Sequence, residues 1–289
     1  MHSRQSHARS NWSPDGLRLV SGAADGNTIV WYPFANGPHD VAETHEVARL
    51  EGHEGDVWSV VYSRDGTKLA SASVDATVRV WDAGTYTEIH KLEGHTSQVM
   101  LVAFTPDCRR IISFADTGGR IWDVQTGQAI ATMDGHTSAI WSMSISNAGD
   151  RVITGSEDRS ARIWDSTTGV ELVTLNEHTG PVWAVAFSPD DTEVVSGSYD
   201  STLVSCDSYT GERHHVFTER PAIIDSVIYS NSGKYIVCGA ADGSVKFWDR
   251  YTGGLIAAHR AHNDKVKNLL FTRDDKTSFN PRMTGRLAC

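Results

Sequence analysis

The sequence has few cysteines, and none of them lies near another. No two of the four form a C-x-x-C pair, so their spacing predicts neither a zinc site nor a disulfide framework. We therefore expect reduced thiols and a cytoplasmic or nuclear location. The cysteines are Cys108, Cys206, Cys238 and Cys289.

Long apolar runs are also missing. No stretch approaches the length that a membrane-spanning helix needs, so we expect no membrane segment. The segment Met1–Ser6 is polar, and we expect no signal peptide. There is no G-x-x-x-x-G-K-[ST] loop, and the glycines fall at turn positions, so the sequence predicts no nucleotide site, no cofactor and no small-molecule substrate.

Basic clusters are the third absence. The chain carries 26 Lys and Arg against 36 Asp and Glu, a net charge of −10. This balance disfavours direct nucleic-acid binding, which depends on a basic surface. Proteins or peptides remain as partners, and an acidic surface permits basic tails among them.

A repeat of 41 or 42 residues runs through most of the chain. The steps lead from His53 to His95, His136 and His178, and two further steps of 42 reach Arg220 and His262. A period of this length is typical of propeller blades, each a four-stranded unit that cannot bury a core alone.

Each repeat pairs a Gly-His near its start with a Trp-Asp near its end, and some pairs are altered. This pattern resembles the WD40-repeat family over nearly the whole chain. The pairs are Gly52-His53 with Trp81-Asp82, Gly94-His95 with Trp122-Asp123, Gly135-His136 with Trp164-Asp165, Glu177-His178 with Cys206-Asp207, and Trp248-Asp249 without its histidine.

The second repeat shows the expected strands most clearly. Val57–Tyr62, Lys68–Ser73 and Thr77–Trp81 are rich in β-branched, aromatic or small residues, and Ser63–Gly66 makes a turn between the first two. The more polar Thr87–Leu92 suits the outer edge of a blade.

We predict a single all-β domain over residues 1–289, a WD40-type β-propeller on a seven-blade plan with incomplete first and last blades. The innermost strand of the first blade should lie near the polar residues 7–12, and the last repeat departs from the pattern after Asp275. The chain is either a propeller with a defective seam or a piece of a longer protein. The repeats span approximately residues 8–49, 50–91, 92–132, 133–174, 175–216, 217–258 and 259–289.

Two sets of repeat residues resemble the catalytic triad of a hydrolase. One is His136 with Thr154 and Asp158, and the other is His178 with Ser196 and Asp200. An active site is needed once, whereas this spacing recurs in repeat after repeat, so a repeated structural role explains it better.

The family resemblance supplies that role, because it implies a buried hydrogen-bond tetrad of His, Ser or Thr, Asp and Trp in each blade. Such a network rigidifies a blade when it is complete. The matching positions are His53, Ser71, Asp75, Trp81; His95, Ser113, Asp116, Trp122; His136, Thr154, Asp158, Trp164; His178, Ser196, Asp200; and Asp242, Trp248.

Residues that differ between repeats are the candidates for partner binding. The resemblance implies that the position five residues after each repeat histidine opens onto the top face of the propeller. Trp and Met there favour a docking surface, although the rings could instead plug the inner channel. The candidates are Trp58, Met100, Trp141, Trp183, Asp225 and Lys267, with Val74, Glu157 and Tyr199 beside them.

These features predict a non-catalytic scaffold that binds a peptide or partner domain on its top face. The repeats are similar to those of proteins in chromatin and transcription complexes and of NACHT-type signalling proteins. Because the first and last repeats are incomplete, one alternative is a detached regulatory propeller portion of a larger NACHT-type signalling ATPase. A second alternative is a hydrolase built on His178, Ser196 and Asp200.

Overall fold

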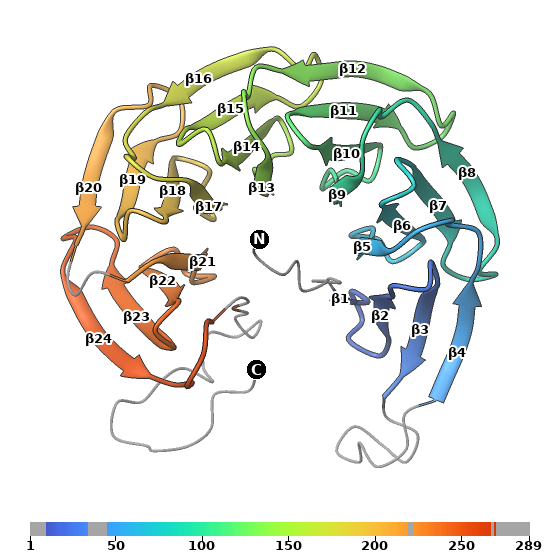
Figure 1. Cartoon of the computed structure of the whole chain (residues 1–289), viewed down its shortest axis with the longest axis horizontal. Helices are drawn as coiled ribbons and strands as arrows, with labels where there is room; N and C mark the ends of the chain where they lie inside the picture. Colours follow the sequence, from blue (N-terminus) through green and yellow to red (C-terminus); the bar gives the residue numbers. More distant parts are fainter. Residues whose placement is uncertain (1–9, 34–44, 219–221, 267–268, 270–289) are drawn as a thin grey trace. The chain divides into compact units, whose positions relative to one another are not determined.

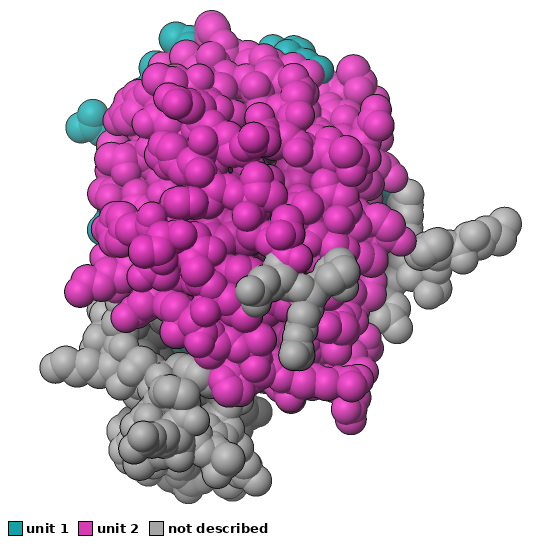
Figure 2. All heavy atoms as spheres, turned by 90° about the vertical axis from the view of Figure 1, so that its left-hand side faces the viewer, with its two compact units in different colours: residues 1–135, 166–169 teal, residues 136–165, 170–289 magenta. Residues whose placement is uncertain are grey.

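The computed structural model describes residues 10–33, 45–218, 222–266 and 269. In these ranges the regular structure consists of strands, which form six antiparallel sheets of four strands each (Figure 1). The all-β prediction is therefore confirmed, whereas seven blades are not. The chain divides into two compact units (Figure 2): residues 1–135 with 166–169, and residues 136–165 with 170–289.

Unit 1 contains the first three sheets. In each of them the strands follow sequence order from one edge to the other. The strands are β1 (Ser10–Trp12), β2 (Leu19–Gly22), β3 (Thr28–Tyr32) and β4 (His45–Leu50); β5 (Val57–Tyr62), β6 (Lys68–Ser73), β7 (Val78–Asp82) and β8 (Glu88–Leu92); β9 (Val99–Phe104), β10 (Arg110–Ala115), β11 (Gly118–Asp123) and β12 (Ala129–Asp134).

Unit 2 contains the other three sheets, with the same strand order. Its strands are β13 (Ile140–Ile145), β14 (Arg151–Ser156), β15 (Ala161–Asp165) and β16 (Glu171–Leu175); β17 (Val182–Phe187), β18 (Glu193–Ser198), β19 (Leu203–Asp207) and β20 (Arg213–Phe217); β21 (Ile224–Tyr229), β22 (Tyr235–Ala240), β23 (Ser244–Asp249) and β24 (Leu255–Arg260).

The strands expected in the second repeat match β5 to β8 to within one residue at each end. The turn between β5 and β6 depends on its polar residues. Ser63 donates a hydrogen bond to Asp65 at 2.6 Å, and Gly66 takes the left-handed φ of +71° that glycine tolerates best. Short polar turns of this kind let consecutive strands pair directly.

The prediction of an incomplete first blade is wrong for the strand count. The first sheet has four strands, because Ser10–Trp12 pairs with Leu19–Ser21 despite its polarity. Backbone hydrogen bonds do not require apolar side chains, and so a strand of three residues forms there. The predicted seventh repeat lies outside the described residues after Val266, apart from Leu269.

The core of each unit lies between neighbouring sheets. Ala70 and Ala72 of the second sheet pack in one cluster with Val99, Val102 and Trp122 of the third. The middle strand β6 is buried on both faces, whereas the fourth strands β8 and β12 are mostly exposed. Because full burial of a valine, leucine or isoleucine side chain contributes about 1.5–3 kcal/mol, the stacking of sheets stabilises each unit.

The candidate tetrads and the partner surface

The second sheet brings together its four predicted tetrad residues. Trp81 on β7 donates its indole N–H to Ser71 Oγ on β6 at 2.9 Å, and the serine lies 2.8 Å from His53 Nε2. The other ring nitrogen, Nδ1, lies 2.8 Å from Asp75 Oδ2 in the β6–β7 turn. The four side chains thus form one continuous hydrogen-bonded chain.

The charges in this network follow from burial and hydrogen bonding. Burial lowers the pKa of His53 despite the neighbouring carboxylate, which leaves the imidazole neutral at pH 7. Burial opposes the ionisation of Asp75, but hydrogen bonds from Thr77 and His53 outweigh it and lower its pKa to about 2. The Nδ1–H group therefore donates to a carboxylate, and Nε2 accepts from the serine hydroxyl.

The fourth sheet repeats the arrangement with a threonine. His136 lies 2.8 Å from both Asp158 Oδ2 and Thr154 Oγ1, and the indole N–H of Trp164 donates to the same threonine oxygen at 2.8 Å. Hydrogen bonds again hold the pKa of Asp158 at about 2, although burial opposes them.

The fifth sheet has the same His and Ser pair but lacks the indole. His178 Nε2 lies 2.8 Å from Ser196 Oγ, while Nδ1 lies 2.9 Å from Thr202 Oγ1 and 3.3 Å from Asp200 Oδ2. Cys206 takes the place of the tryptophan, and burial raises the pKa of its thiol to about 12. It remains a neutral apolar side chain at pH 7.

The third sheet departs from the predicted tetrad at its aspartate. His95 lies 2.7 Å from Ser113 Oγ, to which Trp122 donates at 2.8 Å. Asp116 is exposed at the tip of a two-residue hairpin, where Ala115 pairs with the residue after the turn. The deleted residue shortens this turn, so within the described chain the carboxylate does not reach the histidine.

The sixth and first sheets contain partial networks. Asp242 accepts from the backbone N–H and hydroxyl of Ser244, while the buried indole N–H of Trp248 is directed at the thiol of Cys238, which takes the place of the serine. In the first sheet Trp31 donates to Ser21 at 2.8 Å, a pair that was not among the predicted tetrads. Their spacing of ten residues, shared with the second and fourth sheets, was the available signal.

The burial of the tetrad hydroxyls argues against catalysis by these residues, because a substrate cannot reach them. A nucleophilic serine must touch the carbonyl carbon that it attacks. Ser196 is only 3 % exposed and Ser71 is fully buried. The hydroxyls of Ser71 and Thr154 also accept an indole N–H, so these networks connect strands within a sheet.

A β-bulge lies at the same register in the first strand of five sheets. At each bulge the ladder skips one residue of the first strand: Trp58, Met100, Trp141, Trp183 or Asp225. A bulge leaves one residue out of the ladder and changes the direction of its side chain. These are the positions expected to bind a partner, except Lys267, which lies outside the described residues.

Three of the predicted partner-binding side chains form an aromatic cluster in unit 2. The rings of Trp141 and Trp183 lie 6.2 Å apart, and those of Trp183 and Tyr199 lie 5.9 Å apart. Trp141 is 36 % exposed and Tyr199 is 50 % exposed, so the cluster reaches the surface. We call these three residues the aromatic cluster.

The remaining candidates lie at the same ends of their sheets. In unit 1, Val74 is 38 % exposed, and the indole N–H of the half-buried Trp58 has no acceptor among the described residues. In unit 2, Glu157 is exposed and accepts from Ser138 at 3.1 Å, while Asp225 is half-buried.

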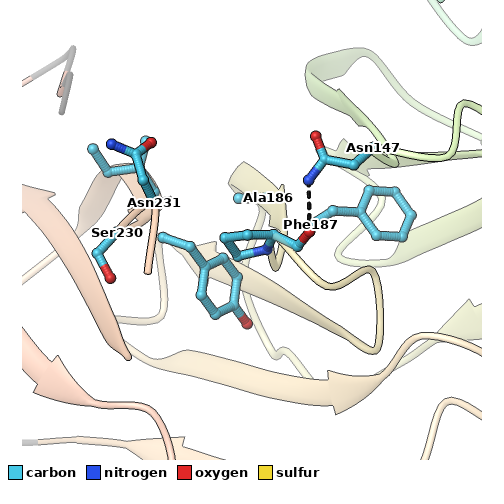
Figure 3. Close-up of a pocket in the computed structure, with 8 residues that line it drawn as sticks. Asn147, Ala186, Phe187, Ser230 and Asn231 are labelled. Carbon is cyan, nitrogen blue, oxygen red and sulfur yellow. Dashed lines mark hydrogen bonds between the residues drawn. The ribbon is translucent and has the colours of Figure 1, made fainter. Parts of the chain in front are cut away.

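A hollow of about 400 Å³ lies at the opposite ends of the first strands in unit 2 (Figure 3). Phe187 and Tyr229 are among its lining residues, and Asn147 donates to the carbonyl of Pro189 at 2.8 Å beside it. The lining contains no charged side chain. No local sequence pattern indicates this hollow, because its residues lie on β17, on β21 and in three turns that are about forty positions apart in the chain.

No group of three or more His, Cys, Asp or Glu side chains in the described ranges is placed to hold a metal ion. Within the same ranges, no helix has the length and apolar character to cross a membrane.

A family model described as "WD domain, G-beta repeat" matches this chain six times. The matches together cover more than half of the sequence, and each ends at or near a third strand. They span residues 4–32, 44–82, 86–123, 127–165, 169–205 and 211–249.

Several curated proteins are similar over about a third of the chain. A segment of 105 residues is 28 % identical to Protein hir1 of Schizosaccharomyces pombe and covers 33 % of this chain and 11 % of that protein. A segment of 96 residues is 41 % identical to the Chromatin assembly factor 1 subunit FAS2 homolog of Oryza sativa subsp. japonica. It covers 33 % of this chain and 18 % of that protein. A segment of 109 residues is 33 % identical to Coronin-7 of Mus musculus and covers 37 % of this chain and 12 % of that protein. The chain thus spans less than a fifth of the length of each relative.

Proposed function

The chain belongs to the WD40-repeat family, and from this premise we propose that it is a non-catalytic scaffold that binds a peptide or partner domain. The binding residues on unit 2 are the aromatic cluster with Glu157 and Asp225. Trp58, Met100 and Val74 bind protein in the same way on unit 1. A fold hosts many functions, so the proposal depends on these side chains and not on the family alone.

The observation that carries the proposal is the recurrence of large side chains at the bulge positions. Trp141 and Trp183 occupy such positions, and with Tyr199 they reach the surface. Tryptophan and tyrosine are enriched among the residues that contribute most binding energy in interfaces. A channel plug would need no exposed Tyr199 beside it, so exposure favours docking over plugging.

The partner class follows from charge and from a relative's name. A net charge of −10 suits a basic peptide, including a basic tail. The rice relative is named as a subunit of a chromatin assembly factor. We therefore propose a nuclear multi-protein complex as the setting of this chain.

Affinity capture from nuclear extract tests the proposal. The immobilised chain is compared with its Trp58→Ala and Trp183→Ala variants, and Tyr235→Ala serves as a matched control. Tyr235 is an exposed aromatic residue on β22, at the end of its sheet opposite Asp225. We expect the bound proteins to be lost or reduced at least tenfold in a tryptophan variant and retained in the control. If both tryptophan variants fold and retain every partner, the proposal is wrong.

A further inference from the structure

A lysine of the chain itself lies against the aromatic cluster. The ammonium nitrogen of Lys265 is 5.6 Å from the ring centroid of Trp183. A lysine within about 6 Å of a tryptophan face interacts with the negative face of the ring. Trp183 therefore has a face that accepts a cation in the free protein.

The arrangement around Trp183 leaves this face open to exchange. Lys265 is exposed, and Val266 next to it is held by a backbone hydrogen bond to Ala240 at 3.2 Å. The lysine side chain can consequently leave the ring while its backbone stays in place. Exposed cation–π contacts contribute only about 0.5–1 kcal/mol, so an incoming cation can replace this one.

An acidic residue in the neighbouring sheet favours the same kind of ligand. Asp225 occupies on β21 the bulge position that Trp183 occupies on β17, and these two strands contact each other. Tyr199 and Trp141 flank Trp183 with further ring surface. Aromatic rings with an acidic residue on the neighbouring strand suit an alkylammonium group better than a neutral or anionic one.

We propose that the aromatic cluster binds a lysine side chain of the partner against Trp183, and that Lys265 occupies this position in the free protein as an internal competitor. This inference rests on the proposed function and adds the chemistry of the bound group. The partner segment supplies a protonated amine on an aliphatic stem, which replaces Lys265 on the ring.

The test uses n-butylammonium as a probe of the lysine head group and n-butanol as its neutral analogue. Resonances of the 5-fluorotryptophan-labelled chain are followed by fluorine NMR at constant ionic strength. We expect a saturable shift of the Trp183 resonance with n-butylammonium and a weaker one with n-butanol. Lys265→Met should move that resonance without ligand and lower the half-saturating concentration about two- to fivefold, whereas Lys265→Arg should not lower it.

Control variants separate this inference from the proposed function. Trp183→Leu, which keeps an apolar side chain, should lose the saturable response in the remaining tryptophans, and Tyr235→Ala should keep it. Equal responses to both probes, or an unchanged half-saturating concentration in Lys265→Met, would overturn the inference. Partners that still depend on Trp183 in the capture experiment would then leave the scaffold function standing, with a different bound group.

Discussion

His53, His136 and His178 each lie within hydrogen-bond reach of a hydroxyl and a carboxylate, an arrangement that resembles a catalytic relay. Burial nevertheless lowers the pKa of all three imidazoles, and Ser71 and Ser196 are closed to substrate. We infer that each tetrad fixes the turn before a first strand to the middle of its sheet. The role of a residue here depends on access as much as on geometry.

The size of this structural role can be measured in His136→Ala. The variant removes one hydrogen-bond partner of Thr154 and leaves the buried carboxylate of Asp158 without its histidine partner. We therefore expect the free energy of unfolding to fall by about 2–4 kcal/mol. His95→Ala is the matched control, because His95 has no carboxylate partner in the described chain and should lose less. Urea denaturation measures both. Equal losses would show that the aspartate contributes nothing.

His95 also predicts a pH dependence of stability. Burial, with a smaller effect of Arg120, lowers its pKa to about 4 from an ordinary value near 6.5. The unfolded chain therefore takes up a proton at a higher pH than the folded chain. The contribution of His95 to the free energy of unfolding is fully present above pH 6.5. It is lost as the pH falls toward 4, by up to about 3 kcal/mol.

Urea midpoints between pH 7 and pH 4.5 check this prediction. The wild-type midpoint should fall with pH, and that of His95→Gln should fall less steeply. Burial also lowers the pKa of His53, His136 and His178, so the midpoint of the variant should still fall somewhat with pH. An identical slope in the variant would show that His95 titrates at its ordinary pKa.

At the scale of the elements, a buried arginine connects the fifth and sixth sheets. Arg250, after β23, donates to Glu193 on β18 at 2.5 Å and to Asp190 at 2.9 and 3.1 Å. Arg250 and Glu193 are each about 5 % exposed. The guanidinium also lies 5.6 Å from the rings of both Tyr229 and Tyr251.

Removal of this arginine should destabilise unit 2 strongly. Arg250→Ala leaves Glu193 charged and buried, which costs about 3–5 kcal/mol. Arg151→Ala is the control. Arg151 donates to the carbonyl and hydroxyl of Ser208, so its removal leaves no buried carboxylate without a partner. Thermal denaturation should show a larger loss for Arg250→Ala and partial recovery when Glu193→Met is added. The absence of any recovery would contradict the assignment.

The close approach of neighbouring sheets gives a second prediction at this scale. A Cβ atom on Gly197 of β18 would lie 2.4 Å from Ile224 Cγ2 of β21. Gly197→Ala should therefore cost about 1–3 kcal/mol through overpacking. Gly254→Ala, where the nearest atom is 3.3 Å away, is the control and should change the melting temperature little. Similar melting temperatures for the two variants would argue against tight packing there.

The sequence predicts the strands well, because apolar alternation and polar turns recur in each repeat. It does not predict the bulges, since a bulge depends on how two strands pair and not on residue type. The prediction that Asp116 joins the tetrad is wrong for a related reason. One deleted residue turns a longer loop into a two-residue hairpin. The Arg250 contacts join residues 57 to 60 positions apart, and no local pattern indicates them.

At the scale of the whole molecule, the repeat separates two classes of residue. Positions that recur in most of the sheets fill the core or the tetrads, whereas the bulge positions and their neighbours vary. Unit 2 has aromatic rings and an acidic residue at these positions, and unit 1 has a tryptophan and a methionine. Variation on a rigid repeated frame is how one architecture binds different partners.

Amide hydrogen exchange of the chain with and without its captured partner tests the central claim most directly. We predict slower exchange in the bulge segments of unit 2, Ile140–Ser142 and Val182–Ala184, and around Tyr199. Exchange in β16, β20 and β24 should be unchanged. Protection confined to these fourth strands, with the bulge segments exchanging as in the free chain, would contradict the account.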